Sequence, residues 1–142
     1  MTSYPDTSLI VSAFTEEAGT PLADRWVASL AADTLVFSAW CLTEISSALV
    51  AKVRTRSLTV VESGRLISAI PAMLRDTGKE IPVARRHFVA AASLLERCSA
   101  SLKASDALHL AIAADAAATL WTLDRRMAEA GRSLGLDVEL LG

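Results

Sequence analysis

Short strand-like runs alternate with helical segments along the whole sequence, and this alternation most constrains the fold. Strands are predicted at Ser3–Pro5, Leu35–Phe37, Glu80–Val83, Thr119–Leu123 and Val138–Leu141. Helices are predicted at Ser8–Thr15, Thr20–Ala32, Ala39–Arg54, from a capping box at Thr59 and Glu62 to about Thr77, at Ala84–Cys98, Leu102–Ala117 and Arg125–Leu134. Alternation of this kind is typical of βαβ units, in which helices cover both faces of a parallel sheet. We therefore predict an α/β fold, a three-layer α/β/α domain with a mostly parallel central sheet.

Length and composition indicate one folded domain over residues 1–142. The 142 residues fit a single compact domain, and 52% hydrophobic residues exclude a disordered tail. Two cysteines, far apart in the chain, are predicted to be free thiols in a reducing compartment. No signal peptide and no apolar run of the ~20 residues that span a membrane are visible. We therefore predict a cytoplasmic protein without membrane contact.

The charge and the polar residues restrict any contact with nucleic acid. The net charge of -2 excludes a general nucleic-acid coat protein but not a nuclease with an acidic site. The sequence contains neither Asn nor Gln, so the bidentate amide contact to adenine is excluded.

Carboxylates follow or begin several predicted elements on one side of the sheet. Asp6 follows the first strand and Asp124 follows the strand Thr119–Leu123. Glu44 lies early in the helix after the second strand, away from its apolar stripe, and Asp106 lies early in its own helix. Ligands of open α/β sheets bind at the carboxyl ends of the strands. We expect these four acids to meet at that edge.

Four clustered carboxylates repel one another, and a divalent cation would relieve this repulsion. Mg²⁺ and Mn²⁺ prefer oxygen ligands and retain water for chemistry. A cation at this edge could bind a phosphate oxygen, lower the pKa of a water and stabilise a leaving oxygen. The acids therefore predict metal-dependent hydrolysis of a phosphodiester.

Each acid also has an ordinary structural interpretation. Asp6 and Asp124 are good helix N-caps, Asp106 suits the first turn of a helix, and Glu44 suits a solvated helix face. Only their joint placement favours a shared site.

The sequence resembles the PIN-domain ribonucleases, in particular the VapC-type toxins of type II toxin–antitoxin systems. The resemblance covers essentially the whole chain, and its motifs occur in the family's order. They are YPDTS at Tyr4–Ser8, LTEISSAL at Leu42–Leu49, SDALHLAIA at Ser105–Ala113 and TLDRRM at Thr122–Met127.

This resemblance implies a metal-dependent endoribonuclease that uses Mg²⁺ or Mn²⁺. The family's acids carry over to Asp6, Glu44, Asp106 and Asp124 as catalytic and metal-binding residues. Glu44 would complete the metal site or orient the attacking water. The family's hydroxyls carry over to Ser8 and Thr122, which would fix the orientation of the carboxylates; both also suit an ordinary turn or strand.

The resemblance also implies an RNA substrate, a cognate antitoxin protein and a homodimer. An amphipathic antitoxin helix could pack on the apolar residues of two predicted helices. Plain core packing is the alternative for these residues, which are Trp26, Val27, Leu30, Leu66, Ile67, Ile70 and Leu74.

Several cations are candidates for phosphate contacts. Arg125 and Arg126 follow Asp124, and Lys52, Arg54 and Arg56 end a helix, where they equally suit compensation of the helix dipole.

The two histidines receive different predictions. His109 is predicted to be a buried, hydrogen-bonded histidine, with RNA contact as the alternative, and His87 is predicted to face solvent.

Two other functions stay open from the residues. An aspartate-nucleophile phosphohydrolase also places Asp after the first strand, but it usually has a second Asp where Ser8 stands. A non-catalytic protein-interaction module on the same fold is the other alternative.

Overall fold

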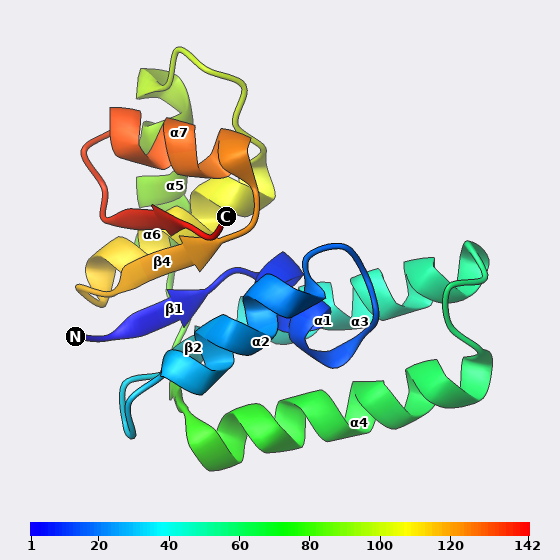
Figure 1. Ribbon diagram of the computed structural model, residues 1–142. Helices are drawn as coiled ribbons and strands as arrows, with labels where there is room; N and C mark the ends of the chain where they lie inside the picture. The colour runs from blue at the N-terminus through cyan, green and yellow to red at the C-terminus, as the bar shows by residue number, and fades with distance from the viewer.

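The computed structural model describes residues 1–142 and contains the predicted alternation of strands and helices (Figure 1). The strands are β1 (Ser3–Pro5), β2 (Val36–Ser38), β3 (Lys79–Ile81), β4 (Thr119–Thr122) and β5 (Val138–Leu140). The helices are α1 (Thr7–Phe14), α2 (Thr20–Ser29), α3 (Ala39–Arg54), α4 (Val60–Thr77), α5 (Arg85–Arg97), α6 (Ala104–Asp115) and α7 (Arg125–Ser133). Most ends lie within two residues of the prediction, whereas the helix predicted to reach Ala32 ends at Ser29.

All strand pairs are parallel. One sheet has the order β1-β4-β5, and a second sheet pairs β2 with β3. A parallel bridge between Ser3 and Leu35 joins the two pieces, and the Ser3 amide donates to the Thr34 carbonyl at 2.8 Å. The strands therefore follow the spatial order β3-β2-β1-β4-β5.

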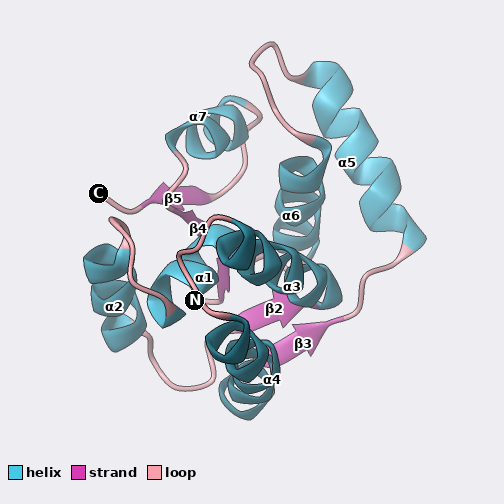
Figure 2. Cartoon of the chain, turned by 90° about the vertical axis from the view of Figure 1, so that its right-hand side faces the viewer, coloured by secondary structure: helices cyan, strands magenta, loops and turns pink.

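Helices cover both faces of this sheet. The chain moves in one direction from β1 to β3 and then returns to β4 and β5, and right-handed crossovers in opposite directions place their helices on opposite faces. Figure 2 shows α5, α6 and α7 on one side of the strands and α1, α2 and α4 on the other. The predicted three-layer α/β/α fold is confirmed.

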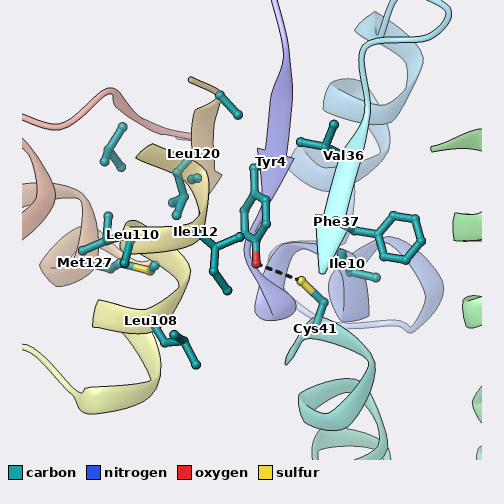
Figure 3. Packing of buried hydrophobic residues seen from close by; sticks show 14 of the residues in the cluster. Tyr4, Ile10, Val36, Phe37, Cys41, Leu108, Leu110, Ile112, Leu120 and Met127 are labelled. Atoms are coloured by element: carbon teal, nitrogen blue, oxygen red, sulfur yellow. Dashed lines mark hydrogen bonds between the residues drawn. The ribbon is translucent and has the colours of Figure 1, made fainter. Parts of the chain in front are cut away.

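The core lies between the sheet and its helices. Its main cluster holds 23 buried residues, including the fully buried Tyr4, Phe37 and Leu120 (Figure 3). Helix α6 contributes buried residues all round, from Ala107 to Ala113, because α5 covers its outer side. The apolar segment that bears Asp106 and Asp124 near its ends is therefore fixed at the centre of the molecule.

Helices α3 and α4 lie against each other and extend together beyond the sheet (Figure 1). The predicted capping box begins α4, with Thr59 and Glu62 each bonded to the other's backbone amide. A proline inside a helix usually kinks or splits it, but α4 is continuous through Pro71 to Thr77. Ile70 and Leu74 are buried against the main core on either side of Pro71, and this packing holds both halves of the helix in place. No helix is both long enough and apolar enough to cross a membrane.

His87 joins α5 to α6 and does not face solvent. Its ring is 1% exposed, its Nδ1 accepts from the Ala84 amide at 2.9 Å, and its Nε2 contacts Asp115 at 2.8 Å. Because Nδ1 accepts, the ring hydrogen lies on Nε2 and is donated to the carboxylate. Arg86 also pairs with Asp115, at 3.0 Å. The prediction of a solvent-facing His87 is wrong, because the sequence did not reveal that Asp115 on α6 lies opposite this residue.

Two helical glycines should respond in opposite ways to alanine. A Cβ on Gly131 would lie 2.6 Å from Val138 Cγ2, whereas a Cβ on Gly64 would meet nothing within 4 Å. Gly64→Ala should raise the free energy of unfolding by up to about 1 kcal/mol through helix propensity. Gly131→Ala gains the same propensity but overpacks a buried site at a cost of about 1–3 kcal/mol, so its net effect should be destabilising. Urea unfolding of both variants tests this, and a Gly131→Ala protein more stable than wild type would contradict the packing described.

Candidate functional site

The pairing of β1 with β4 brings residues from opposite ends of the sequence together. Pro5 lies opposite Trp121, and the Asp6 amide donates to the Trp121 carbonyl at 3.0 Å. Asp6 and Thr122 therefore leave the sheet side by side at its carboxyl edge. The Thr122 hydroxyl donates to Asp6 Oδ2 at 2.6 Å.

Asp6 is a buried carboxylate that accepts several hydrogen bonds. It is 5% exposed and caps α1 by accepting from the Leu9 amide at 2.8 Å. The Ser8 hydroxyl lies 2.9 Å from Oδ1 and 3.0 Å from Oδ2. Burial raises the pKa of Asp6 and outweighs the opposing hydrogen bonds from Thr122, Leu9 and Ser8. Ser8 and Thr122 thus fix the orientation of an acid whose ionised form is unfavourable.

Asp124 and Asp106 lie at the starts of α7 and α6. Asp124 caps α7, because its Oδ1 accepts from the Arg126 amide at 2.9 Å and from the Met127 amide at 3.3 Å. Asp106 lies in the first turn of α6, which begins at the carboxyl edge of the sheet. Burial raises the pKa of Asp106, and the neighbouring charges of Asp124 and then Asp6 raise it further. Asp106 therefore lies close enough to Asp124 and to Asp6 for its carboxylate to be repelled by both.

Glu44 reaches the same edge from α3. Its Oε1 accepts from the Thr7 hydroxyl at 2.9 Å and contacts His109 Nε2. Burial by itself would raise the pKa of Glu44, but the contacts with His109 and Thr7 outweigh burial and lower it. Burial would likewise lower the pKa of His109, yet contacts with Cys41 and Glu44 raise it to about 10. Glu44 is thus held in its ionised form by a histidine from α6.

The four acids line one open cleft of about 360 Å³. Two polar side chains that the sequence did not single out, Ser47 and Ser105, also line it. Asp6 and Asp124 each cap a helix and also line this shared cleft, so the helix-cap interpretation and the shared-site interpretation are compatible. No group of three or more acidic, histidine or cysteine side chains is as close together as metal ligands would be. The acids share a cleft without being drawn around one point.

Cations are distributed differently from the sequence-based expectation. None of Lys52, Arg54, Arg56, Arg125 and Arg126 lines the acidic cleft. Lys52 pairs instead with Glu17 and lines a separate polar pocket. Lys103, the residue before α6, is the one lysine or arginine in the cleft lining. In the sequence, the indication that Lys103 lies near the cleft is its position three residues before Asp106.

Comparisons with known proteins identify what this fold is similar to. The family model described as "PIN domain" matches residues 3–133. No curated protein matches the sequence significantly.

Three solved structures are similar over most of the chain. The Mycobacterium tuberculosis toxin VapC20, described as cleaving the sarcin–ricin loop, superposes with a TM-score of 0.72 and 19% identity, over 92% of this chain and 95% of that one. A toxin–antitoxin complex from Klebsiella pneumoniae gives a TM-score of 0.63 and 17% identity, over 89% and 91%. VapBC2 from Rickettsia felis, bound to a promoter DNA fragment, gives 0.67 and 16%, over 100% of both chains. At these identities the likeness concerns the fold.

Removing one acid from the cleft should stabilise the metal-free protein at neutral pH. The pKa of Asp106 is raised in the folded state, so the folded protein binds more protons than the unfolded chain between ~3.9 and the raised value. Stability is therefore lost as the pH rises through that window. Asp106→Asn should raise the Tm at pH 7 by a few degrees, and the gain should shrink as the pH is lowered toward ~4.

Glu129→Gln is the matched control, because Glu129 is exposed on α7 and outside the cleft lining. This variant should change stability by less than about 0.5 kcal/mol. Thermal unfolding in chelator measures both variants. A Tm for Asp106→Asn at or below that of wild type at pH 7 would show that the carboxylates do not repel one another appreciably.

Proposed function

Because this chain belongs to the PIN-domain family, we propose that it is a metal-dependent endoribonuclease and the toxin of a toxin–antitoxin pair, with residues 1–142 acting as one PIN domain. The observation that carries the proposal is the cleft lined by Asp6, Glu44, Asp106 and Asp124. Four carboxylates from four separate elements in one open cleft are unfavourable unless they serve a cation.

The donor set suits Mg²⁺ or Mn²⁺. All four candidate ligands are carboxylates, which hard divalent cations prefer. A cation held by Asp6, Asp106 and Asp124, completed by Glu44, would offset the burial and the repulsion that together raise the pKa of Asp106. When bound, such an ion lowers the pKa of water and stabilises charge on phosphate oxygens.

The chain's own residues have distinct roles in this proposal. Ser8 and Thr122 donate to Asp6 and fix the orientation of its carboxylate. Glu44 is held in its ionised form, so it can complete the cation site or orient the attacking water by accepting a hydrogen bond from it. Asp106 at the start of α6 and Asp124 after β4 place negative charge in the cleft.

RNA is the proposed substrate, and Lys103 is the proposed phosphate contact. VapC20, which shares the fold, is described as cleaving the sarcin–ricin loop. Lys103 lies in the lining of the acidic cleft and has no salt-bridge partner within the chain. Because Lys103 forms no salt bridge with the four acids, it can bind a phosphate of the substrate and leave the acids available for a cation. Arg125 and Arg126, exposed at the start of α7, can contact the RNA farther from the cleft.

An antitoxin is the proposed partner. An apolar groove of about 480 Å³ lies between α2 and α4 and suits the apolar face of an antitoxin helix. Trp26, Val27, Leu30 and Leu74, from the residues expected to receive such a helix, line this groove, whereas Ile70 is fully buried in the core. For the proposed homodimer, α5 offers the exposed side chains Phe88 and Val89. The Klebsiella pneumoniae structure of the same fold is a toxin–antitoxin complex.

An aspartate-nucleophile phosphohydrolase is less consistent with the site. Such an enzyme needs an accessible carboxylate, and Asp6 is 5% exposed with both oxygens engaged by Ser8 or Thr122. The residue two positions after Asp6 is Ser8, which bonds to Asp6 where that chemistry uses a second acid.

Cleavage of RNA in the presence of added metal is the direct test. The antitoxin-free protein should cut tRNA or ribosomal RNA fragments at discrete sites with Mg²⁺ or Mn²⁺, and cutting should stop with chelator. Asp6→Asn and Asp106→Asn should each lower the rate at least about 100-fold, because each removes a cation ligand. Gel analysis of end-labelled RNA measures this.

The matched control is Asp137→Asn, which removes an acid outside the cleft lining. It should leave cleavage unchanged. No cutting of any RNA, together with no Mn²⁺ binding by calorimetry, would instead support a non-catalytic interaction module.

Lys103 should matter for substrate binding more than the cations at the end of α3. Lys103→Ala should raise the KM for RNA about 5–10-fold, since one lost phosphate contact costs roughly 1 kcal/mol or more, and should reduce the salt dependence of KM. Arg54→Ala removes the same charge outside the cleft lining and should change KM less than about 2-fold. A larger effect from Arg54 would place the RNA along α3 and contradict the role of Lys103.

A further inference from the structure

A buried chain of polar side chains runs beneath the acidic cleft. Ser38 Oγ lies 2.8 Å from the Tyr4 hydroxyl, which lies 2.8 Å from His109 Nδ1. His109 Nε2 contacts Glu44 Oε1, the atom that also accepts from Thr7 at 2.9 Å. These five residues come from β2, β1, α6, α3 and α1, so the chain crosses the sheet edge at the place where its elements meet.

At the core end of this hydrogen-bonded series, the Tyr4 side chain is tightly packed. Tyr4 is fully buried in the main cluster, with its ring between Ile112 and Cys41, and its hydroxyl accepts from Cys41 Sγ at 3.3 Å (Figure 3). Its ring also packs edge-on to His109, with 5.7 Å between ring centroids. A tyrosine held on all sides in this way fixes the position of the His109 ring.

Packing does not explain the contact between His109 and Glu44 at the cleft end of this series. His109 is 2% exposed, and an apolar residue would fill its place on α6 without the cost of burying a ring that needs hydrogen bonds. Glu44 does not require His109 for solvation, because its side chain is 26% exposed and can reach water. Its two bonds within the protein both go to Oε1, and Oε2 accepts none. The contact therefore fixes the direction of the carboxylate while one oxygen stays available.

We propose that His109 is a positioning residue that holds the Glu44 carboxylate in the acidic cleft through its Nε2–H, with Tyr4 and Thr7 fixing the two ends of the contact. His109 lies three residues after Asp106, so one turn of α6 delivers an acid to the cleft and a donor to the acid on α3. The inference rests on the proposed function, since Glu44 is positioned for that reaction.

Three variants test this positioning on the complete chain. His109→Leu should lower kcat for RNA about 10–100-fold and change KM less than about 2-fold, because the variant misplaces a carboxylate without touching substrate. His109→Gln should recover part of the loss, since its side-chain amide can donate from near the place of Nε2. Thr7→Val removes the second donor to Glu44 with little change in shape and should also lower kcat, and it keeps the test valid if His109→Leu does not fold.

A double-mutant cycle separates positioning from general destabilisation. In a Glu44→Ala background, His109→Leu should cost less than about 3-fold in kcat, because the group that it positions is already absent. A loss of kcat that is the same in both backgrounds, or a folded His109→Leu protein as active as wild type, would overturn the proposal.

Two readouts do not depend on RNA cleavage. The chain has 2 histidines, so ¹⁵N spectra of the imidazoles are assigned with one variant of each. Glu44→Gln should shift the His109 Nε2 proton and leave that of His87 unchanged, because His87 bonds to Asp115. His109→Leu should also weaken Mn²⁺ binding about 10-fold by calorimetry.

These readouts distinguish failure of the proposed function from failure of the positioning role. If wild type binds Mn²⁺ and shows the His109–Glu44 contact but cuts no RNA, the proposed function fails while the positioning role stands. If Glu44→Gln leaves the His109 resonance unchanged, or if His109→Leu binds Mn²⁺ like wild type, the positioning role fails whatever the RNA experiment shows.

Discussion

The burial of the Asp6 carboxylate at the end of β1 is the constraint on which the rest of the site depends. A carboxylate that is 5% exposed is costly unless hydrogen bonds or a cation compensate the lost hydration. The pairing of β1 with β4 supplies Thr122, the first turn of α1 supplies Ser8 and the Leu9 amide, and burial still raises the pKa of Asp6. The protein thus keeps an acid that its own hydrogen bonds do not fully stabilise, which is the expected sign of a site built for a ligand.

The second feature of the site is its division into two kinds of acid. Burial raises the pKa of Asp6, and burial together with the charges of Asp124 and Asp6 raises the pKa of Asp106, whereas contacts with His109 and Thr7 lower the pKa of Glu44. A bound divalent cation would stabilise the ionised aspartates, whereas the protonated His109 already stabilises the ionised Glu44. This difference supports separate roles, with the three aspartates as the main cation ligands and Glu44 as the residue that completes the site or orients the attacking water.

The order of strands and helices could be predicted because each element follows from its own sequence, and the edge that collects the acids follows from the rule for parallel sheets. Ser8 and Thr122 were named only through the family resemblance, and for Thr122 nothing local shows that it bonds to Asp6, 116 residues away. The burial of His109 was predicted and is confirmed, but the partners of both histidines could not be predicted from the sequence, because Asp115 and Glu44 lie on other elements. The positions of the cations could not be predicted for the same reason. Lys52 forms a salt bridge with Glu17, and Lys103 lines the cleft because of where α6 lies.

The claim that these four carboxylates form one cation site is tested most directly by a crystal structure of the antitoxin-free protein soaked in Mn²⁺ and recorded with anomalous scattering. We predict one or two anomalous peaks inside the cleft, with carboxylate oxygens of Asp6 and Asp106 at about 2.0–2.3 Å from the metal and a small inward movement of Asp124. Peaks only at the protein surface, or an empty cleft at a Mn²⁺ concentration that saturates binding in solution, would contradict it.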